Sequence, residues 1–114
     1  MAFSITLVDG EMRDGTLADI PALLDSLQGA DVEHPDVSVQ TEEGISVSVF
    51  ADGLAVIEDV ESGELEPHWA TFARRADILA VVAAVTEGET SRAMSLAPWR
   101  AGYGPGAAED EAER

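Results

Sequence analysis

Apolar and polar residues alternate twice between residues 37 and 49, and this pattern limits the possible folds more than any other feature of the chain. Valine or isoleucine occupies every other position in 37–40 and again in 45–49, with serine or glutamine between them. A period of two is that of a β-strand with one buried face. Asp52-Gly53 follows, and an Asp-Gly pair between two apolar runs is a strong hairpin signal because both residues tolerate positive φ. Residues 37–60 therefore predict three strands of an antiparallel meander.

Flanking segments predict further strands. Residues 3–8 alternate loosely in the same way and predict a strand near the beginning of the chain. Residues 65–72 predict a fourth strand of the meander, and Pro67 favours an edge position for it because proline cannot donate a backbone hydrogen bond. Residues 91–99 would supply one last strand through Met94 and Leu96.

A first helix is expected before the meander. The segment Thr16–Asp19 approximates a capping box, and apolar residues at helical spacing follow it as far as Leu27. Asp19 as N-cap would place Pro21 in the first turn, where proline is tolerated, and a kinked beginning of the helix is the alternative. Gly29 would end the helix.

A second helix is predicted over residues 74–88. Thr71 can cap its beginning and Gly88 its end. Its apolar residues share one face, so it must gain stability by packing on the sheet. These residues are Ile78, Val81, Val82 and Val85.

Together the elements predict an α+β fold, in which an antiparallel β-meander sheet carries two helices packed on one face as a two-layer sandwich. Residues 1–101 would form a single domain, and residues 102–114 a flexible tail that begins with glycine and proline and ends with acids. The helices would leave the other sheet face partly uncovered. The serines of that face leave room for a flat partner, a second copy of the chain included.

Charge is the second constraint. The chain has a formal net charge of -17, and no lysine or arginine occurs in residues 14–73. Such a field repels nucleic acid and anionic membranes, so neither is expected as a partner, but it attracts basic proteins. General solubilisation, or adaptation to a salt-rich cytoplasm, would explain the same acidity. The residues expected to bind a basic partner are Glu42, Glu43, Asp52, Glu58, Asp59, Glu61, Glu64, Glu66, His68 and Trp69.

The sequence lacks the residues that several kinds of catalytic or metal site require. Cysteine is absent, which excludes disulfides, thiolate nucleophiles and cysteine-bound metals. Neither a Gly-x-Ser-x-Gly elbow nor a phosphate-binding glycine loop occurs. Nothing selects a catalytic pair among the acids, so neither an enzyme activity nor a cofactor is expected. Residues 1–8 lack the basic start of a signal peptide, and the longest apolar run, 78–85, is too short to span a bilayer, so a cytoplasmic location is expected.

One spacing suits a metal ion. Glu64, Glu66 and His68 alternate, and on a strand they would share one face. A solvated strand face is the simpler interpretation, with His68 pointing to solvent and Trp69 pointing into the core. Trp99 is expected to close the core against the second helix.

In layout and charge the chain resembles small bacterial immunity proteins, which neutralise a cognate toxin. The resemblance consists of the order strand, helix, acidic meander, helix and a terminal tryptophan, without a diagnostic residue string, so no family residue is carried over. It implies a non-catalytic inhibitor that binds a basic partner. Two alternatives stay open: a self-associating structural or regulatory domain that uses the open sheet face, and a metal- or ligand-binding protein that uses Glu64, Glu66 and His68.

Overall fold

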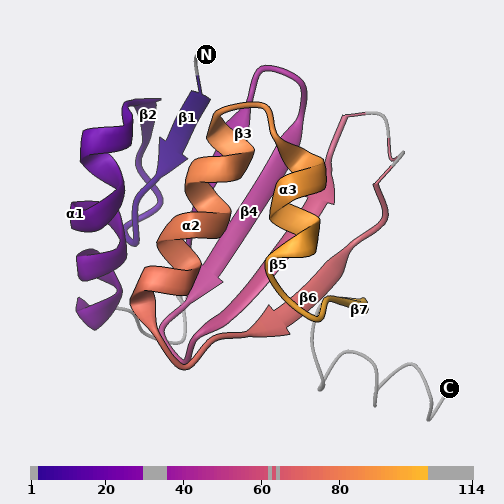
Figure 1. Cartoon of the computed structure of the whole chain (residues 1–114). Helices are drawn as coiled ribbons and strands as arrows, with labels where there is room; N and C mark the ends of the chain where they lie inside the picture. The colour runs from indigo at the N-terminus through magenta and orange to yellow at the C-terminus, as the bar shows by residue number, and fades with distance from the viewer. Residues whose placement is uncertain (1–2, 30–35, 62, 64, 103–114) are drawn as a thin grey trace, which may run out of the picture.

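The structure is a computed structural model that describes residues 3–29, 36–61, 63 and 65–102. These residues form an antiparallel sheet with helices on one of its faces, which confirms the predicted α+β fold (Figure 1). The strands lie in the order β2-β1-β3-β4-β5-β6-β7. Their bounds are β1 Phe3–Thr6, β2 Met12–Gly15, β3 Asp36–Thr41, β4 Ile45–Phe50, β5 Leu54–Asp59, β6 His68–Thr71 and β7 Arg100–Ala101. The helices are α1 Ile20–Asp25, α2 Arg75–Thr86 and α3 Thr90–Ser95, with 3-10 turns at Leu17–Asp19 and Ser26–Gly29.

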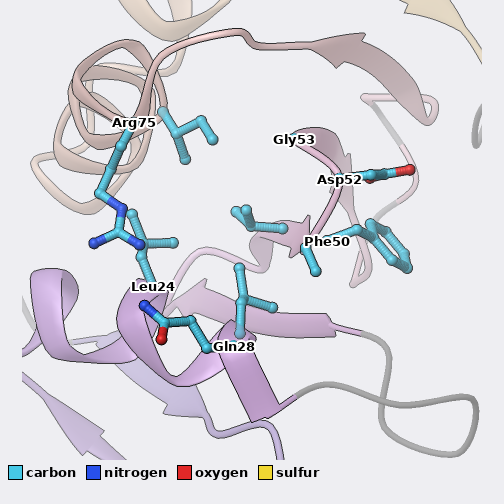
Figure 2. Close-up of a pocket in the computed structure, with 10 residues that line it drawn as sticks. Leu24, Gln28, Phe50, Asp52, Gly53 and Arg75 are labelled. Atoms are coloured by element: carbon cyan, nitrogen blue, oxygen red, sulfur yellow. The ribbon is translucent and has the colours of Figure 1, made fainter.

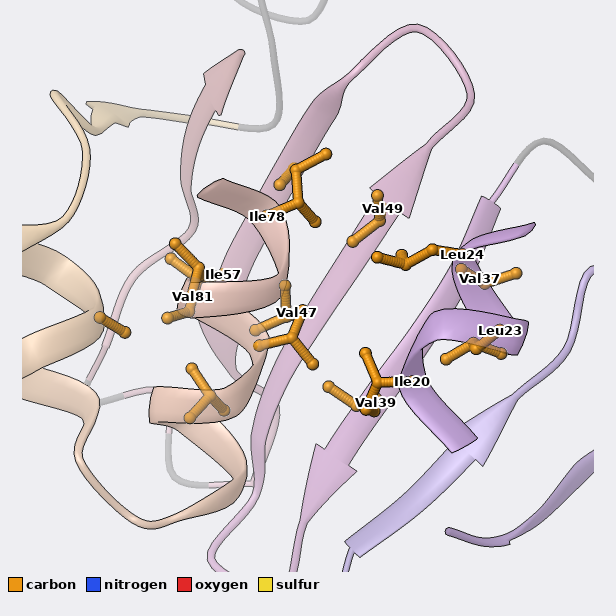
Figure 3. Close-up of a cluster of buried hydrophobic side chains, with 14 of the residues drawn as sticks. Ile20, Leu23, Leu24, Val37, Val39, Val47, Val49, Ile57, Ile78 and Val81 are labelled. Atoms are coloured by element: carbon orange, nitrogen blue, oxygen red, sulfur yellow. The ribbon is translucent and has the colours of Figure 1, made fainter. Parts of the chain in front are cut away.

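The hydrophobic core fills the space between the helices and one face of the sheet (Figure 3). Successive side chains of a strand point to opposite faces, so the alternation in the sequence produces one buried row and one uncovered row. On the helix side, Ile57 is fully buried and Val47 is 1% exposed. Each such side chain stabilises the fold by about 1.5–3 kcal/mol. The helices cover this row with Ile20, Leu23 and Leu24 of α1 and with Ile78, Val81, Val82 and Val85 of α2.

The β4–β5 hairpin turns at Asp52-Gly53, as predicted. Gly53 has a φ of 91°, and its N–H donates to the Phe50 carbonyl at 3.1 Å. The Asp52 carboxylate accepts the Leu54 N–H at 3.1 Å. A Cβ on Gly53 would lie 2.4 Å from the Phe72 carbonyl oxygen, so only glycine fits.

The start of α1 also follows the prediction. The Asp19 carboxylate accepts the Thr16 N–H at 2.8 Å and the Thr16 hydroxyl at 3.1 Å, and these bonds hold the pKa of Asp19 below its ordinary value. Pro21 falls in the first turn of α1. The chain then leaves the helix through the 3-10 turn that ends at Gly29.

The predicted cap of the second helix is wrong at one end and correct at the other. Thr71 is the last residue of β6, and the N-cap of α2 is Arg74 instead. Gly88 follows the helix with a φ of 81°, and its N–H donates to the Val85 carbonyl at 3.0 Å.

The predicted strand over residues 91–99 is also wrong. Residues 90–95 form α3, and only Arg100 and Ala101 pair with β6 as a strand. Met94 and Leu96 suggested a period of two, but the segment contains Arg, Ala, Met and Leu, which favour helix. Residues 12–15, which lie between the predicted first strand and the predicted first helix, form the edge strand β2 beside β1.

Trp99 packs against the core, as predicted, but the contacts of its indole are with Phe72 and α3, whereas the sequence predicted contacts with the second helix. Its ring meets Phe72 edge to face with the centroids 5.9 Å apart, and its Nε1–H donates to the Ala93 carbonyl at 3.1 Å. The indole therefore closes the core beside α3 with its polar atom satisfied. The predicted tail beyond Gly102 lies outside the described residues.

Candidate functional site

Three segments that are distant in the sequence meet at one end of the sheet, at the top of Figure 1. They are the β3–β4 turn, the chain that leaves β5, and the α2–α3 connection. All three carry carboxylates, and we call this region the acidic end. Its described acids are Glu42, Glu43, Glu58, Asp59, Glu61, Glu66, Glu87 and Glu89.

The β3–β4 turn positions Glu42 and Glu43 at its tip, where both are exposed. Gly44 donates its N–H to the Thr41 carbonyl at 3.0 Å, and the Thr41 hydroxyl accepts the Ile45 N–H at 3.2 Å. Gly44 has a φ of 92°, which strongly favours glycine. The turn thus keeps both side chains exposed to solvent.

The end of β5 is tied to that turn. The Val60 N–H donates to the Gly44 carbonyl at 2.9 Å, so the backbone of the two segments is joined directly. The Asp59 carboxylate accepts the Glu61 N–H at 3.0 Å, and the Asp59 N–H donates to the Leu65 carbonyl at 2.9 Å. The exposed carboxylate of Glu61 is therefore held beside the β3–β4 turn.

A groove of about 470 Å³ crosses the acidic end between the sheet and α3. Ile45, Leu65 and Met94 give it an apolar floor, and all three pack against the core. Glu43 and Asp59 lie on its rim, and Thr90 and Ser91 at the start of α3 complete the lining. We call this the end groove. An apolar floor with a carboxylate rim suits a cationic side chain that has an aliphatic stem.

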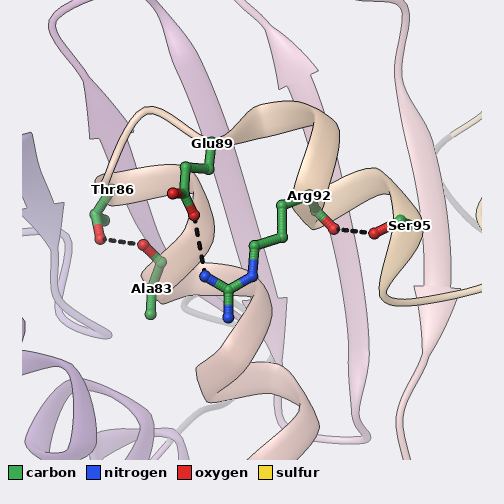
Figure 4. A network of polar contacts seen from close by, with 5 residues as sticks. All are labelled: Ala83, Thr86, Glu89, Arg92 and Ser95. Atoms are coloured by element: carbon green, nitrogen blue, oxygen red, sulfur yellow. Dashed lines mark hydrogen bonds and ion pairs between the residues drawn. The ribbon is translucent and has the colours of Figure 1, made fainter.

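The segments that meet at the acidic end contribute one described arginine. Arg92 of α3 donates to the Glu89 carboxylate at 3.0 Å, one turn away, as Figure 4 shows. The neighbouring hydroxyls are used locally: Thr86 donates to the Ala83 carbonyl and Ser95 to the Arg92 carbonyl. The pair neutralises one carboxylate and leaves the net charge of this end strongly negative.

The structure gathers most of the predicted partner-binding acids. Glu42, Glu43, Glu61 and Glu66 are exposed at the acidic end. Glu58 and Asp59 lie in β5, half-buried on opposite faces of the sheet, and both take part in polar interactions. The remaining acids, Asp52 and Glu64, do not belong to this group. Asp52 lies in the β4–β5 turn at the opposite end of the sheet, and Glu64 lies outside the described residues.

The predicted orientations of His68 and Trp69 are wrong. His68 pairs with Ile57 and Trp69 pairs with Val56, so His68 shares the face that the helices cover and Trp69 lies on the uncovered face. The His68 Nδ1–H donates to the Glu66 carbonyl at 2.7 Å. Arg100 stacks over the Trp69 ring, 5.9 Å from its centroid. On the face that the helices cover, the buried side chain of β6 is that of Ala70 and not the indole of Trp69.

The predicted alignment of Glu64, Glu66 and His68 on one strand is not found among the described residues. β6 begins at His68, so Glu66 is not part of a strand that would align it with His68. Among the residues that the structure describes, no three histidines or acids are placed to hold a metal ion. Glu64, the third member of the spacing, lies outside them.

The opposite end holds a cavity of about 310 Å³ between the end of α1, the start of α2 and the β4–β5 turn (Figure 2). Its walls are mainly apolar and include Leu24, Val49 and Ile78. Arg75 reaches across its mouth and forms an ion pair with Asp25. The Arg75 guanidinium is thus paired within the chain. Asp52 is the one residue of this cavity that also belongs to the residues predicted to bind a basic partner.

Sequence reasoning missed two contributions. Glu87 and Glu89 reach the acidic end because α2 runs back along the sheet, which no local pattern indicates. Arg100 reaches Trp69 through the short strand β7. Within the described residues, no helix is long and apolar enough to cross a membrane.

No protein-family model, curated protein or solved structure matches this chain. The functional argument therefore depends on the chain's own geometry and charge.

Proposed function

We propose that this chain is a non-catalytic protein that binds a basic protein through its acidic end, as an immunity or antitoxin-like inhibitor does. The observation that carries the proposal is the end groove, where the apolar side chains of Ile45, Leu65 and Met94 lie beside two carboxylates, Glu43 and Asp59, from distant segments. The binding would occlude the partner's surface, and no reaction is required of the chain.

The two parts of this site have different tasks. The exposed acids Glu42, Glu43, Glu61 and Glu66 would steer a basic partner and raise the rate at which it associates. Each such solvated charge contributes little to affinity by itself, so the four acids act together. The end groove would supply the buried centre, where a lysine or arginine stem packs against Met94 and Leu65.

The acidic end is also rigidly built, which favours binding. The bond from Val60 to Gly44 and the bond from Glu61 to the Asp59 carboxylate fix both carboxylate-bearing turns before a partner arrives. Preorganised groups lose less conformational entropy on association.

Affinity capture from extracts of the source cells tests the proposal with three forms of the chain. The end variant, Glu42→Gln/Glu43→Gln/Glu61→Gln/Glu66→Gln, removes four charges from the acidic end. The control variant, Asp9→Asn/Glu11→Gln/Asp52→Asn/Asp77→Asn, removes four charges elsewhere and keeps the hydrogen-bonding oxygens of Asp9 and Asp52.

Wild type and control variant should retain the same basic protein, and the end variant should lose it. Retention should fall between about 50 mM and about 300 mM salt, because salt screens exposed charges. Equal retention by all three forms, or retention of no basic protein by the wild type, would contradict the proposal.

A further inference from the structure

The sheet face opposite the helices differs in composition from the rest of the chain. The strand register aligns one row of residues across all strands of this face. The row carries no carboxylate, although the net charge of the chain is -17. Its members are Met12, Thr6, Ser38, Ser48, Val56, Trp69 and Arg100.

This uncovered face is partly apolar. The centre of the face carries the short side chains of serine and threonine. Phe50, Leu54 and Trp69 supply apolar surface toward β5 and β6. Val56 is only 6% exposed, although none of the described helices covers it. From Met12 to Trp69 the aligned row carries no charge and includes two apolar side chains at β5 and β6, Val56 and Trp69, which suits a contact surface.

The charges of the face lie at its margins. Asp14 is on the edge strand β2, and Arg100 is on the opposite edge strand β7. Glu58 and Asp36 lie near the two ends of the central strands. Asp36 is partly buried, and burial raises the pKa of its carboxyl.

This arrangement selects a second copy of the chain as the occupant. A twofold axis that runs between two facing sheets, parallel to the strands, places β2 of one copy over β7 of the other. Each Arg100 then lies opposite the partner's Met12, two residues or about 7 Å along β2 from the partner's Asp14, and the carboxylate-free row packs on its equivalent. A basic protein fits this face less well, because Arg100 repels it while the acidic end attracts it.

We propose that the uncovered sheet face is the interface of a homodimer, in which the two sheets pack face to face with Arg100 of each copy near the partner's Asp14. The same axis leaves both acidic ends at one end of the dimer. A dimer would therefore present two copies of the acidic end side by side. The interface itself does not depend on what the acidic end binds.

Sedimentation of the full chain over a range of concentrations tests this interface. A reversible monomer–dimer equilibrium is expected, and its dissociation constant should fall as salt rises, because salt screens the repulsion between two chains of charge -17. This dependence is opposite to that of a complex with a basic protein, so the two proposals are distinguishable. A monomer at every concentration and salt would overturn the dimer.

Charge exchange tests the orientation. Arg100→Asp and Asp14→Arg should each weaken the dimer about tenfold or more, and the double variant Asp14→Arg/Arg100→Asp should restore it. Ser48→Glu, which places a carboxylate in the centre of the face, should abolish the dimer, whereas Asp9→Arg in the exposed β1–β2 turn should leave it intact. Circular dichroism verifies that each variant is folded. An unchanged dissociation constant of the dimer in Ser48→Glu would overturn the proposal. A double variant that dimerises more weakly than either single variant would also overturn it.

Discussion

The side chain of Glu61 lies against the α-carbon of Gly44, so closely that a methyl group on Gly44 would come within 2.8 Å of the Glu61 Cβ. This contact and the adjacent bond from Val60 to the Gly44 carbonyl join the two turns that carry the exposed acids Glu42, Glu43 and Glu61. The absence of a side chain at residue 44 is thus a requirement of the site as well as of the turn.

Gly44→Ala should destabilise the chain for two reasons. The positive φ of Gly44 costs an alanine about 1–2 kcal/mol, and the clash with Glu61 adds to that cost. Urea denaturation of Gly44→Ala and Gly10→Ala separates the two effects, because Gly10 has a φ of 89° but open space around it. Equal losses of unfolding free energy in the two variants would show that Glu61 does not pack against this turn.

Ser91→Arg should block the end groove without disturbing the fold. Ser91 is exposed and lines the groove, so an arginine there can lay its own cation across the carboxylate rim. The matched control is Ser95→Arg, which makes the same change one turn later in α3, outside the groove lining. Titration with the captured basic protein should give about tenfold or greater loss of affinity for Ser91→Arg alone. Similar losses in both variants would indicate a general effect of charge.

Asp19→Ala should lower the unfolding free energy in a pH-dependent way. Hydrogen bonds from Thr16 hold the pKa of Asp19 below its ordinary value, so the folded state favours the ionised carboxylate. This stabilisation is present above pH 3.8 and is lost as the pH falls through the lower pKa of the folded state. Denaturation at neutral and at strongly acidic pH should therefore show a difference from wild type that shrinks with acid. A difference that is independent of pH would contradict this role.

Ile57→Ala should be among the most damaging single substitutions. Ile57 is fully buried in β5 between the helices and the sheet, and truncation there costs about 2–5 kcal/mol. Leu17→Ala is the control, because Leu17 is 49% exposed and its truncation should cost about 0.5 kcal/mol or less. Thermal and urea denaturation measure both values, and similar losses would contradict the described core.

The sheet was predictable where one face is buried. In residues 37–49 the period of two follows directly from the burial of alternate valines, and the Asp52-Gly53 turn follows from the positive φ that Gly53 tolerates. β2 has no buried face, so it left no periodic signal. It exists because β1 offers it a hydrogen-bonding edge. In residues 90–95, helix propensity and the pairing of Arg92 with Glu89 outweigh a two-residue alternation.

The candidate site was only half predictable. The sequence identifies Glu42, Glu43 and Glu61 as acids beside turns, but their proximity depends on the pairing of β4 with β3 and β5. The orientation of Trp69 depends on the register of β6 against β5, and a shift of one residue exchanges the two faces. The end groove includes Met94 because α2 returns the chain to the start of β4, which is a tertiary effect.

The most direct test of the central claim is the association rate of the captured basic protein with wild type, the end variant and the control variant, measured by stopped flow at low salt. If the acidic end steers the partner, the end variant should associate about tenfold or more slowly, while the control variant stays close to wild type. The difference should disappear at high salt. Equal association rates for the end and control variants would show that the overall charge of the chain, and not its acidic end, attracts the partner.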